Sequence, residues 1–181
     1  MANLQKQPTF SAKNLCLVAI FTALICVLAP ISLPIYTVPI SLATLVIYVT
    51  GATLNLRNSI LAVTAYILIG LTGLPVFSNF TGGVGVILGV TGGFIIGYIP
   101  CVIIISLIVN KLNKVKYSYP LAMAVGTIIL YFFGVVYYMI AFKVNLTVAM
   151  STCVLPFIII DVVKIAVASI ISITLYSRLI L

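Results

Sequence analysis

Long, continuously apolar segments separated by short loops dominate this chain of 181 residues. A helix that crosses a lipid bilayer needs about 20 consecutive apolar residues, and it satisfies its backbone polar groups internally. Strands of a membrane barrel alternate apolar and polar residues, which these segments do not. The pattern predicts an all-α, polytopic membrane protein, residues 1–181 forming a single integral membrane domain. Six transmembrane helices are expected, roughly at Asn14–Ala29, Ile40–Leu54, Ser59–Leu74, Gly92–Asn110, Leu121–Phe142 and Met150–Tyr176.

The composition agrees with a membrane protein and excludes several other classes. Hydrophobic residues make up 64% of the chain and charged residues 6%, which excludes an ordinary soluble domain. The formal net charge is +8, but the basic residues are scattered over loops without interleaved aromatics, so we expect no nucleic acid partner. The chain has no histidine, and its four cysteines lack CxxC spacing, so we expect no metal site.

Asp161 is the only acidic residue of the chain, and it lies inside an apolar run with Lys164 three residues later. A charge at the bilayer centre costs about 2.5–3.5 kcal/mol on insertion scales, so such residues usually face a partner or a polar cavity. Residues at i and i+3 share one face of a helix and can reach each other or a common ligand. Asp161 and Lys164 are therefore candidate ligand-binding residues, with a structural ion pair as the alternative.

Two loops have unusual compositions. Residues 30–39 contain three prolines, which remove amide donors and favour extended geometry, so we expect a structured, non-helical segment. Residues 73–85 are apolar for a loop but rich in turn-forming residues, and we expect them to pack onto the membrane domain.

The basic residues predict the orientation, because lysine and arginine favour cytoplasmic loops. With the N-terminus inside, seven of them fall on the cytoplasmic side, only Lys143 falls outside, and Lys164 lies within the membrane. Both termini are then cytoplasmic, and both unusual loops are external. Asp161 would lie about eleven residues into the last predicted helix, about 16 Å deep, at the floor of an outward-facing pocket covered by these loops.

The sequence contains neither an ATP-binding motif nor a catalytic one. There is no P-loop, and a single carboxylate excludes paired-carboxylate chemistry. A Ser–Lys hydrolase would need a serine from another helix, because Lys164 has none at i±3 or i±4. We therefore expect no enzyme and no bound cofactor. If the protein concentrates a solute, the energy must come from a partner protein or an ion gradient.

Three segments, in this order, resemble the BioY family, the biotin-binding S components of energy-coupling-factor (ECF) vitamin transporters. The first is Val38-Pro-Ile-Ser-Leu-Ala-Thr-Leu. The second is Gly70-Leu-Thr-Gly-Leu-Pro-Val-Phe with the glycine-rich run after it, from Gly82 to Tyr98. The third is Pro156-Phe-Ile-Ile-Ile-Asp-Val-Val-Lys. The chain departs from many relatives at Ala43, where they carry glutamine, so any polar contact from that position is absent or supplied elsewhere.

The resemblance implies a six-helix fold in the bacterial cytoplasmic membrane, with outer loops closing over biotin. It implies Asp161, Lys164 and Asn79 as polar contacts, and it matches Ala19 and Ala23 to the family's AxxxA docking motif. The implied partners are a transmembrane coupling (T) component and a pair of cytoplasmic ABC ATPases. A carboxylate can accept from the ureido N–H groups of biotin, and an ammonium can donate to its ureido oxygen or to its carboxylate tail.

Three aromatic residues near the outer loops are candidates for the apolar walls of a biotin pocket: Tyr36, Phe77 and Phe80. The alternative is that they are aromatics at the membrane interface.

Two other functions remain open from the sequence. One is a proton- or sodium-coupled secondary transporter with Asp161 as the ion carrier. The other is a non-transporting membrane scaffold in which Asp161 and Lys164 hold helices together. Uptake without ATPases that an uncoupler abolishes would favour the first. Full function after apolar replacement of both residues would favour the second.

Overall fold

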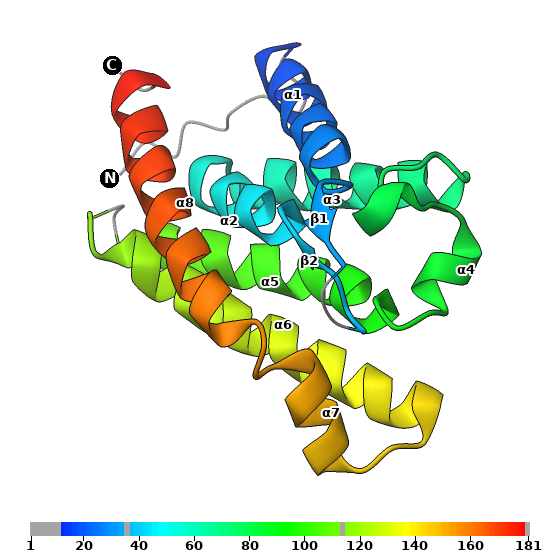
Figure 1. Cartoon of the computed structure of the whole chain (residues 1–181). Coiled ribbons are helices and arrows are strands. Elements are labelled where there is room, and N and C mark those ends of the chain that lie inside the picture. The colour runs from blue at the N-terminus through cyan, green and yellow to red at the C-terminus, as the bar shows by residue number, and fades with distance from the viewer. Residues whose placement is uncertain (1–11, 35–36, 113–114, 180–181) are drawn as a thin grey trace.

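The computed structural model describes residues 12–34, 37–112 and 115–179, without the side chains of residues 177–179. The described chain is mostly helical (Figure 1). Its elements in chain order are α1 (Ala12–Leu28), β1 (Ser32–Leu33), β2 (Ile40–Ser41), α2 (Ala43–Thr53), α3 (Leu56–Leu71), the 3-10 turn η1 (Ser78–Phe80), α4 (Val84–Ile87), α5 (Gly92–Lys111), α6 (Ser118–Phe142), α7 (Leu146–Cys153) and α8 (Ile158–Leu179).

The first five predicted segments each overlap one of the longer helices, namely α1, α2, α3, α5 and α6. Among the described residues, three helices are long and apolar enough to cross a bilayer: Gly92–Lys111, Ser118–Phe142 and Ile158–Tyr176. Helices α1, α2 and α3 are apolar but shorter. These lengths support a helical membrane protein, and the number of six crossings stays a prediction.

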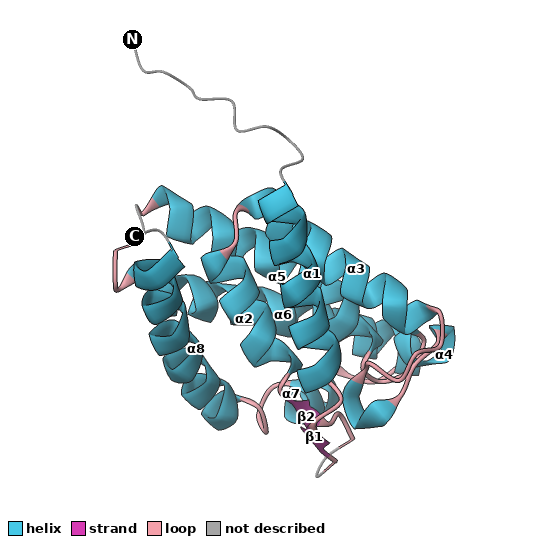
Figure 2. Cartoon of the chain, turned by 90° about the horizontal axis from the view of Figure 1, so that it is seen from above, coloured by secondary structure: helices cyan, strands magenta, loops and turns pink. Residues whose placement is uncertain are grey.

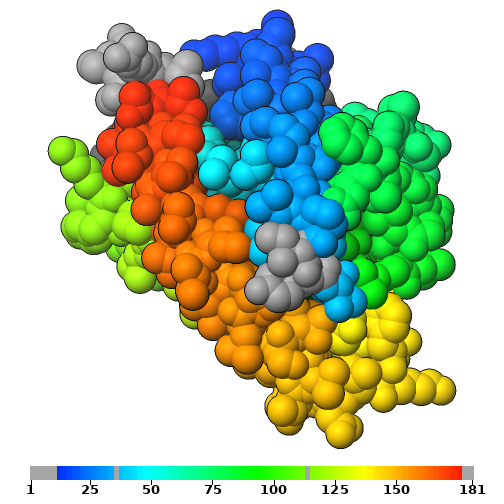
Figure 3. All heavy atoms as spheres, viewed as in Figure 1, coloured from blue at the N-terminus to red at the C-terminus, as the bar shows by residue number. Residues whose placement is uncertain are grey.

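Helix α2 lies inside the bundle, which explains how so short a helix is accommodated. Eight of its eleven residues are buried, and it contacts α1, α3, α5, α6 and α8. Figure 2 shows it surrounded by other helices, and Figure 3 shows only a small part of it between α1 and α8. A hydrogen bond of 2.6 Å joins the hydroxyl of Tyr48 on α2 to that of Thr127 on α6. Helix α2 therefore needs neither the length nor the lipid-facing surface of a peripheral span.

Helices α5 and α6 form the most extensive helix pair, and small residues allow their close approach. A Cβ atom at Gly93 would lie 2.8 Å from the carbonyl oxygen of Phe133, and one at Gly126 would lie 2.7 Å from Ile105. Close backbone approach at small residues is the usual basis of helix packing in membranes, where lipid is as apolar as the helices. Helices α2 and α3 pack against α5, and helices α7 and α8 pack against α6.

The prediction of one continuous helix over Met150–Tyr176 is wrong. Helix α7 ends at Cys153 and α8 begins at Ile158, with a turn between them. Pro156 lies in this turn, where it lacks an amide donor and disfavours helical geometry in the residue before it. As a result Asp161 lies in the first turn of α8, rather than about eleven residues into a helix. The partial positive charge of a helix N-terminus stabilises a carboxylate at this position.

The two unusual loops lie against each other. Strands β1 and β2 form an antiparallel hairpin with Ser32 opposite Ser41. In the loop after α3, Asn79 and Phe80 adopt left-handed backbone geometry, with φ of 60° and 55°. The amide of Asn79 donates to the carbonyl oxygen of Pro30 over 3.2 Å, so η1 is attached to the chain leading into the hairpin.

The connections alternate between two ends of the bundle. Figure 1 shows the start of α1, the end of α8 and the α5–α6 connection towards the top and left. The hairpin, α4 and α7 lie towards the lower right in the same view. The hairpin and the loop after α3 therefore share an end of the molecule, which is where the candidate site lies.

Candidate ligand-binding site

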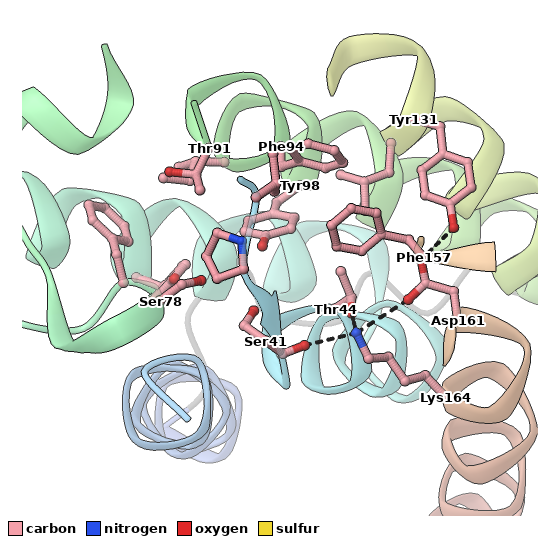
Figure 4. Close-up of a pocket in the computed structure, with 16 residues that line it drawn as sticks. Ser41, Thr44, Ser78, Thr91, Phe94, Tyr98, Tyr131, Phe157, Asp161 and Lys164 are labelled. Atoms are coloured by element: carbon pink, nitrogen blue, oxygen red, sulfur yellow. Dashed lines mark hydrogen bonds and ion pairs between the residues drawn. The ribbon is translucent and has the colours of Figure 1, made fainter. Parts of the chain in front are cut away.

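A cavity lies beneath the hairpin and the loop after α3, between α2, α3, α5, α6 and α8 (Figure 4). The space open to the centre of a water molecule is about 40 Å³. The lining residues are Val38, Pro39, Ser41, Thr44, Tyr66, Phe77, Ser78, Thr91, Phe94, Ile95, Tyr98, Leu130, Tyr131, Phe157, Asp161 and Lys164.

Asp161 and Lys164 form an ion pair at one side of this cavity, as their spacing predicts. The Nζ atom of Lys164 lies 3.3 Å from Oδ1 of Asp161, and the two residues are only 6% and 4% exposed. The other carboxylate oxygen, Oδ2, accepts a hydrogen bond of 2.7 Å from the hydroxyl of Tyr131 on α6. Oδ1 accepts no hydrogen bond from any described residue. One oxygen of a buried carboxylate therefore has a nearby positive charge but no hydrogen-bond donor.

Lys164 is held by groups from the hairpin and α2. Its ammonium donates to the carbonyl oxygen of Ser41 over 2.8 Å and to the hydroxyl of Thr44 over 2.9 Å. Figure 4 shows the ammonium between β2, α2 and the carboxylate of Asp161. Burying a charge is unfavourable unless it is paired and hydrogen-bonded, and these contacts satisfy that requirement for the lysine.

Six of the other lining residues are aromatic: Tyr66, Phe77, Phe94, Tyr98, Tyr131 and Phe157. The rings of Tyr66 and Phe77 meet edge to face with centroids 5.6 Å apart, and those of Phe94 and Phe157 lie 6.0 Å apart. A mostly apolar wall with a few polar anchors is typical of sites for small organic ligands. No three His, Cys, Asp or Glu side chains gather as a metal site would need in the described part of the chain.

Only some of the predicted ligand-binding residues line the cavity. Asp161, Lys164 and Phe77 line the cavity. Asn79 and Phe80 are exposed in η1 and do not line it, and the side-chain oxygen of Asn79 accepts a hydrogen bond of 2.6 Å from Ser32. Tyr36 lies outside the described residues. Contact of any of these residues with a ligand stays a prediction.

Several lining residues were not predicted from the sequence, most importantly Tyr131 and Thr44, which form hydrogen bonds with the ion pair. The sequence contains one indication that some of these residues lie at a polar site. Tyrosines in membrane proteins concentrate at the two interfaces, whereas Tyr131 lies in the middle of α6 and Tyr98 lies well inside α5. A tyrosine away from the interface needs a polar partner, but the sequence does not show which helix supplies it.

The predicted docking residues, Ala19 and Ala23, lie on the exposed face of α1. The opposite face packs against α3, where the hydroxyl of Thr22 donates to the carbonyl oxygen of Ala62 over 3.2 Å. The two alanines are therefore open to a partner helix, and docking there stays a prediction.

Known proteins resemble this chain over nearly its whole length. The model of the BioY family matches residues 3–180. The "Biotin transporter BioY" of Thermotoga maritima is 38% identical, over 86% of this chain and 91% of its own. The "Biotin transporter BioY2" of Lactococcus lactis is 30% identical, over 92% of this chain and 91% of its own.

A solved structure has the same fold. It is described as the crystal structure of the S-component for biotin from an ECF-type ABC transporter. It superposes with a TM-score of 0.84 at 26% identity, covering 98% of this chain and 95% of its own. Sequence, family model and fold agree with the resemblance of the three segments. This chain belongs to the BioY family.

Proposed function

We propose that this protein binds biotin and serves as the substrate-specific S component of an ECF-type transporter that takes biotin into the cell. Its relatives named biotin transporters and the biotin S-component with the same fold support this function. Its role is transport rather than catalysis. The whole chain would form one membrane domain in the bacterial cytoplasmic membrane.

The observation that carries the proposal is the buried carboxylate of Asp161 in the cavity lining, whose Oδ1 has no hydrogen-bond donor among the described residues. Biotin presents a ureido group with two N–H donors, fused to an apolar sulfur ring. A buried carboxylate oxygen accepts an N–H bond strongly, because the site is dry and the acceptor is charged. The aromatic wall suits the sulfur ring, and the ion pair prevents Asp161 from being an isolated buried charge.

In this proposal six helices cross the membrane, and both termini are cytoplasmic. The positive-inside distribution supports this orientation. The hairpin and the loop after α3 then lie outside, where they close the cavity over biotin that arrives from the exterior. Asn79 and Phe80 would join the site when these loops adjust around the ligand, and Tyr36 stays a predicted ligand contact.

The energy for uptake would come from partner proteins. The chain has no P-loop, so ATP hydrolysis falls to a pair of cytoplasmic ABC ATPases, linked through a transmembrane T component. Ala19 and Ala23 on the exposed face of α1 would dock that component, because small residues permit close approach of two helices.

Calorimetry of the purified protein with biotin tests the proposal. The protein should bind one biotin, and Asp161→Asn should weaken binding about 30- to 5,000-fold, as expected when one partner of a buried charge pair is removed. Lys116→Ala, which removes an exposed lysine away from the cavity, should bind normally. No binding by the unaltered protein, or unchanged affinity of the Asp161 variant, would overturn the proposal.

Biotin amide, whose tail is uncharged, identifies the role of Lys164. If the lysine acts at the ureido end, Lys164→Ala should cost biotin and biotin amide similar affinity. If the penalty nearly vanishes for the amide, Lys164 serves the carboxylate tail instead.

The energy source is tested by uptake assays. Uptake that continues without ATPases and that an uncoupler abolishes would replace the ECF mechanism by ion-coupled transport.

A further inference from the structure

Three groups from outside α8 hold the Asp161–Lys164 pair. The hydroxyl of Tyr131 donates to Oδ2 of Asp161 over 2.7 Å. The carbonyl oxygen of Ser41 and the hydroxyl of Thr44 accept from Nζ of Lys164 over 2.8 Å and 2.9 Å. These groups belong to α6, β2 and α2, so three elements fix the pair before any ligand arrives (Figure 4).

Two of the three lysine donors of the pair are used. An ammonium has three N–H groups. Two of them donate to Ser41 and Thr44, and the third has the carboxylate of Asp161 3.3 Å from the nitrogen. The third N–H of Lys164 therefore makes no hydrogen bond with the described residues, and the ammonium lies beside Oδ1 of Asp161 as its counter-charge.

The acceptors of the pair are used unevenly. Oδ2 of Asp161 is occupied by the hydroxyl of Tyr131, whereas Oδ1 accepts no hydrogen bond from the described residues. A buried acceptor without a donor is unfavourable, and most such atoms in proteins find a partner. Tyr131 thus decides which of the two carboxylate oxygens is left for a ligand.

We propose that Tyr131 is a positioning residue, which fixes the carboxylate of Asp161 so that Oδ1 alone is presented to a ligand N–H donor. Lys164, held by Ser41 and Thr44, supplies the neutralising charge. The proposal rests on the proposed function for the identity of the ligand, but not for the geometry of the pair.

This arrangement has a consequence for specificity. An ionised carboxylate oxygen only accepts hydrogen bonds, so it selects a ligand that brings an N–H to it. An analogue without that N–H would leave Oδ1 buried and unpaired, and sites built around a hydrogen bond reject such analogues strongly. The site would therefore discriminate against a biotin analogue with both ureido nitrogens methylated, even where its apolar rings fit.

Tyr131→Phe tests the proposal, because it keeps the ring and removes only the hydroxyl. Hydrogen bonds to charged groups imply about a tenfold to hundredfold loss of biotin affinity when this one is removed. Tyr137→Phe is the matched control. Tyr137 lies on the same helix, its hydroxyl donates to the carbonyl oxygen of Ile87 over 2.8 Å, and it does not line the cavity. The control should bind biotin normally.

A double-mutant cycle separates positioning from direct ligand contact. If Tyr131 acts through Asp161, Tyr131→Phe should cost no further affinity in an Asp161→Ala background. An equal loss in both backgrounds would show that the hydroxyl contacts biotin itself, and it would overturn the proposal.

Infrared spectroscopy gives a readout that needs no ligand. Asp161 is the only acidic side chain of the chain, so aspartate labelled with carbon-13 at its carboxyl group gives a single assignable carboxylate band. In the free protein, this band should shift in Tyr131→Phe and stay in place in Tyr137→Phe. An unchanged band in Tyr131→Phe would overturn the positioning role. Since this measurement omits biotin, failure of the protein to bind biotin would refute the proposed function and leave the positioning test intact.

Discussion

One wall of the cavity depends on a single glycine. The ring of Phe77, which is 1% exposed, lies directly against Gly70 on α3. A Cβ atom at this position would overlap the ring, and because Tyr66 packs edge to face on the same ring, Phe77 cannot move without disturbing the wall. The absence of a side chain at residue 70 is therefore what allows Phe77 to lie in the lining.

Gly70→Ala should destabilise the protein by about 1–3 kcal/mol, the usual range for overpacking a tight interior, and it should weaken ligand binding by displacing Phe77. Thermal unfolding in detergent and calorimetry measure the two effects. Gly85→Ala is the control, since a Cβ atom there would meet no other atom within 4 Å. Equal melting temperatures for the two variants would contradict this account of the wall.

At the residue scale, the sequence predicted what lies within one helical turn and missed what lies far along the chain. The spacing of Asp161 and Lys164 correctly predicted that they reach each other. Tyr131 is 30 residues away from Asp161, and Thr44 is 120 residues away from Lys164. Their contacts depend on the packing and rotation of whole helices, which hydrophobic periodicity alone does not determine.

At the scale of elements, one contact ties the two segments above the cavity together. Ser32 in the hairpin donates to the side-chain oxygen of Asn79 over 2.6 Å, and its hydroxyl oxygen accepts from the amide of Asn79 over 2.8 Å. Because the hairpin and the loop after α3 both contribute lining residues, their separation would open the cavity.

Ser32→Ala should speed biotin dissociation about 2- to 10-fold, since a typical hydrogen bond contributes about 0.5–1.5 kcal/mol. The association rate should rise as well, so the equilibrium affinity should change less than either rate. Release of labelled biotin measures the effect. Ser151→Ala, which removes a hydroxyl that donates to the carbonyl oxygen of Val148 within α7, should leave both rates unchanged. An unaltered dissociation rate in Ser32→Ala would show that the hairpin does not limit exchange.

Replacing both Ala19 and Ala23 with tryptophan should block docking of the coupling component while sparing the cavity, because both alanines are on the exposed face of α1. Biotin binding should persist, whereas complex assembly and ATP-driven uptake should be lost. Ile128→Trp, on an exposed position of α6, is the control and should support uptake. Normal uptake by the double variant would refute docking at these alanines.

The break before α8 shows where prediction from hydropathy fails. Residues 150–176 are apolar on both sides of Pro156, so hydropathy joins α7 and α8 into one span. The proline was visible, but a proline within an apolar run can either kink a helix or end it. Only the packing of α7 against α6 shows that the chain turns here.

At the scale of the whole molecule, the predicted topology can be tested directly. Single cysteines in a variant lacking the four native cysteines can be labelled in intact cells with an impermeant maleimide. Leu74→Cys, in the loop above the cavity, should be labelled, whereas Lys116→Cys, in the α5–α6 connection, should react only after permeabilisation. The reverse pattern would invert the orientation and place the cavity on the cytoplasmic side.

The ion pair also bears on how the membrane potential acts during uptake. The charges of Asp161 and Lys164 lie 3.3 Å apart and cancel, so together they contribute no net charge that an electric field could displace. A potential of 100 mV acts on one elementary charge with about 2.3 kcal/mol. In the proposed transporter the binding site would thus be electrically silent, and voltage would act at the site only on the carboxylate that biotin itself carries.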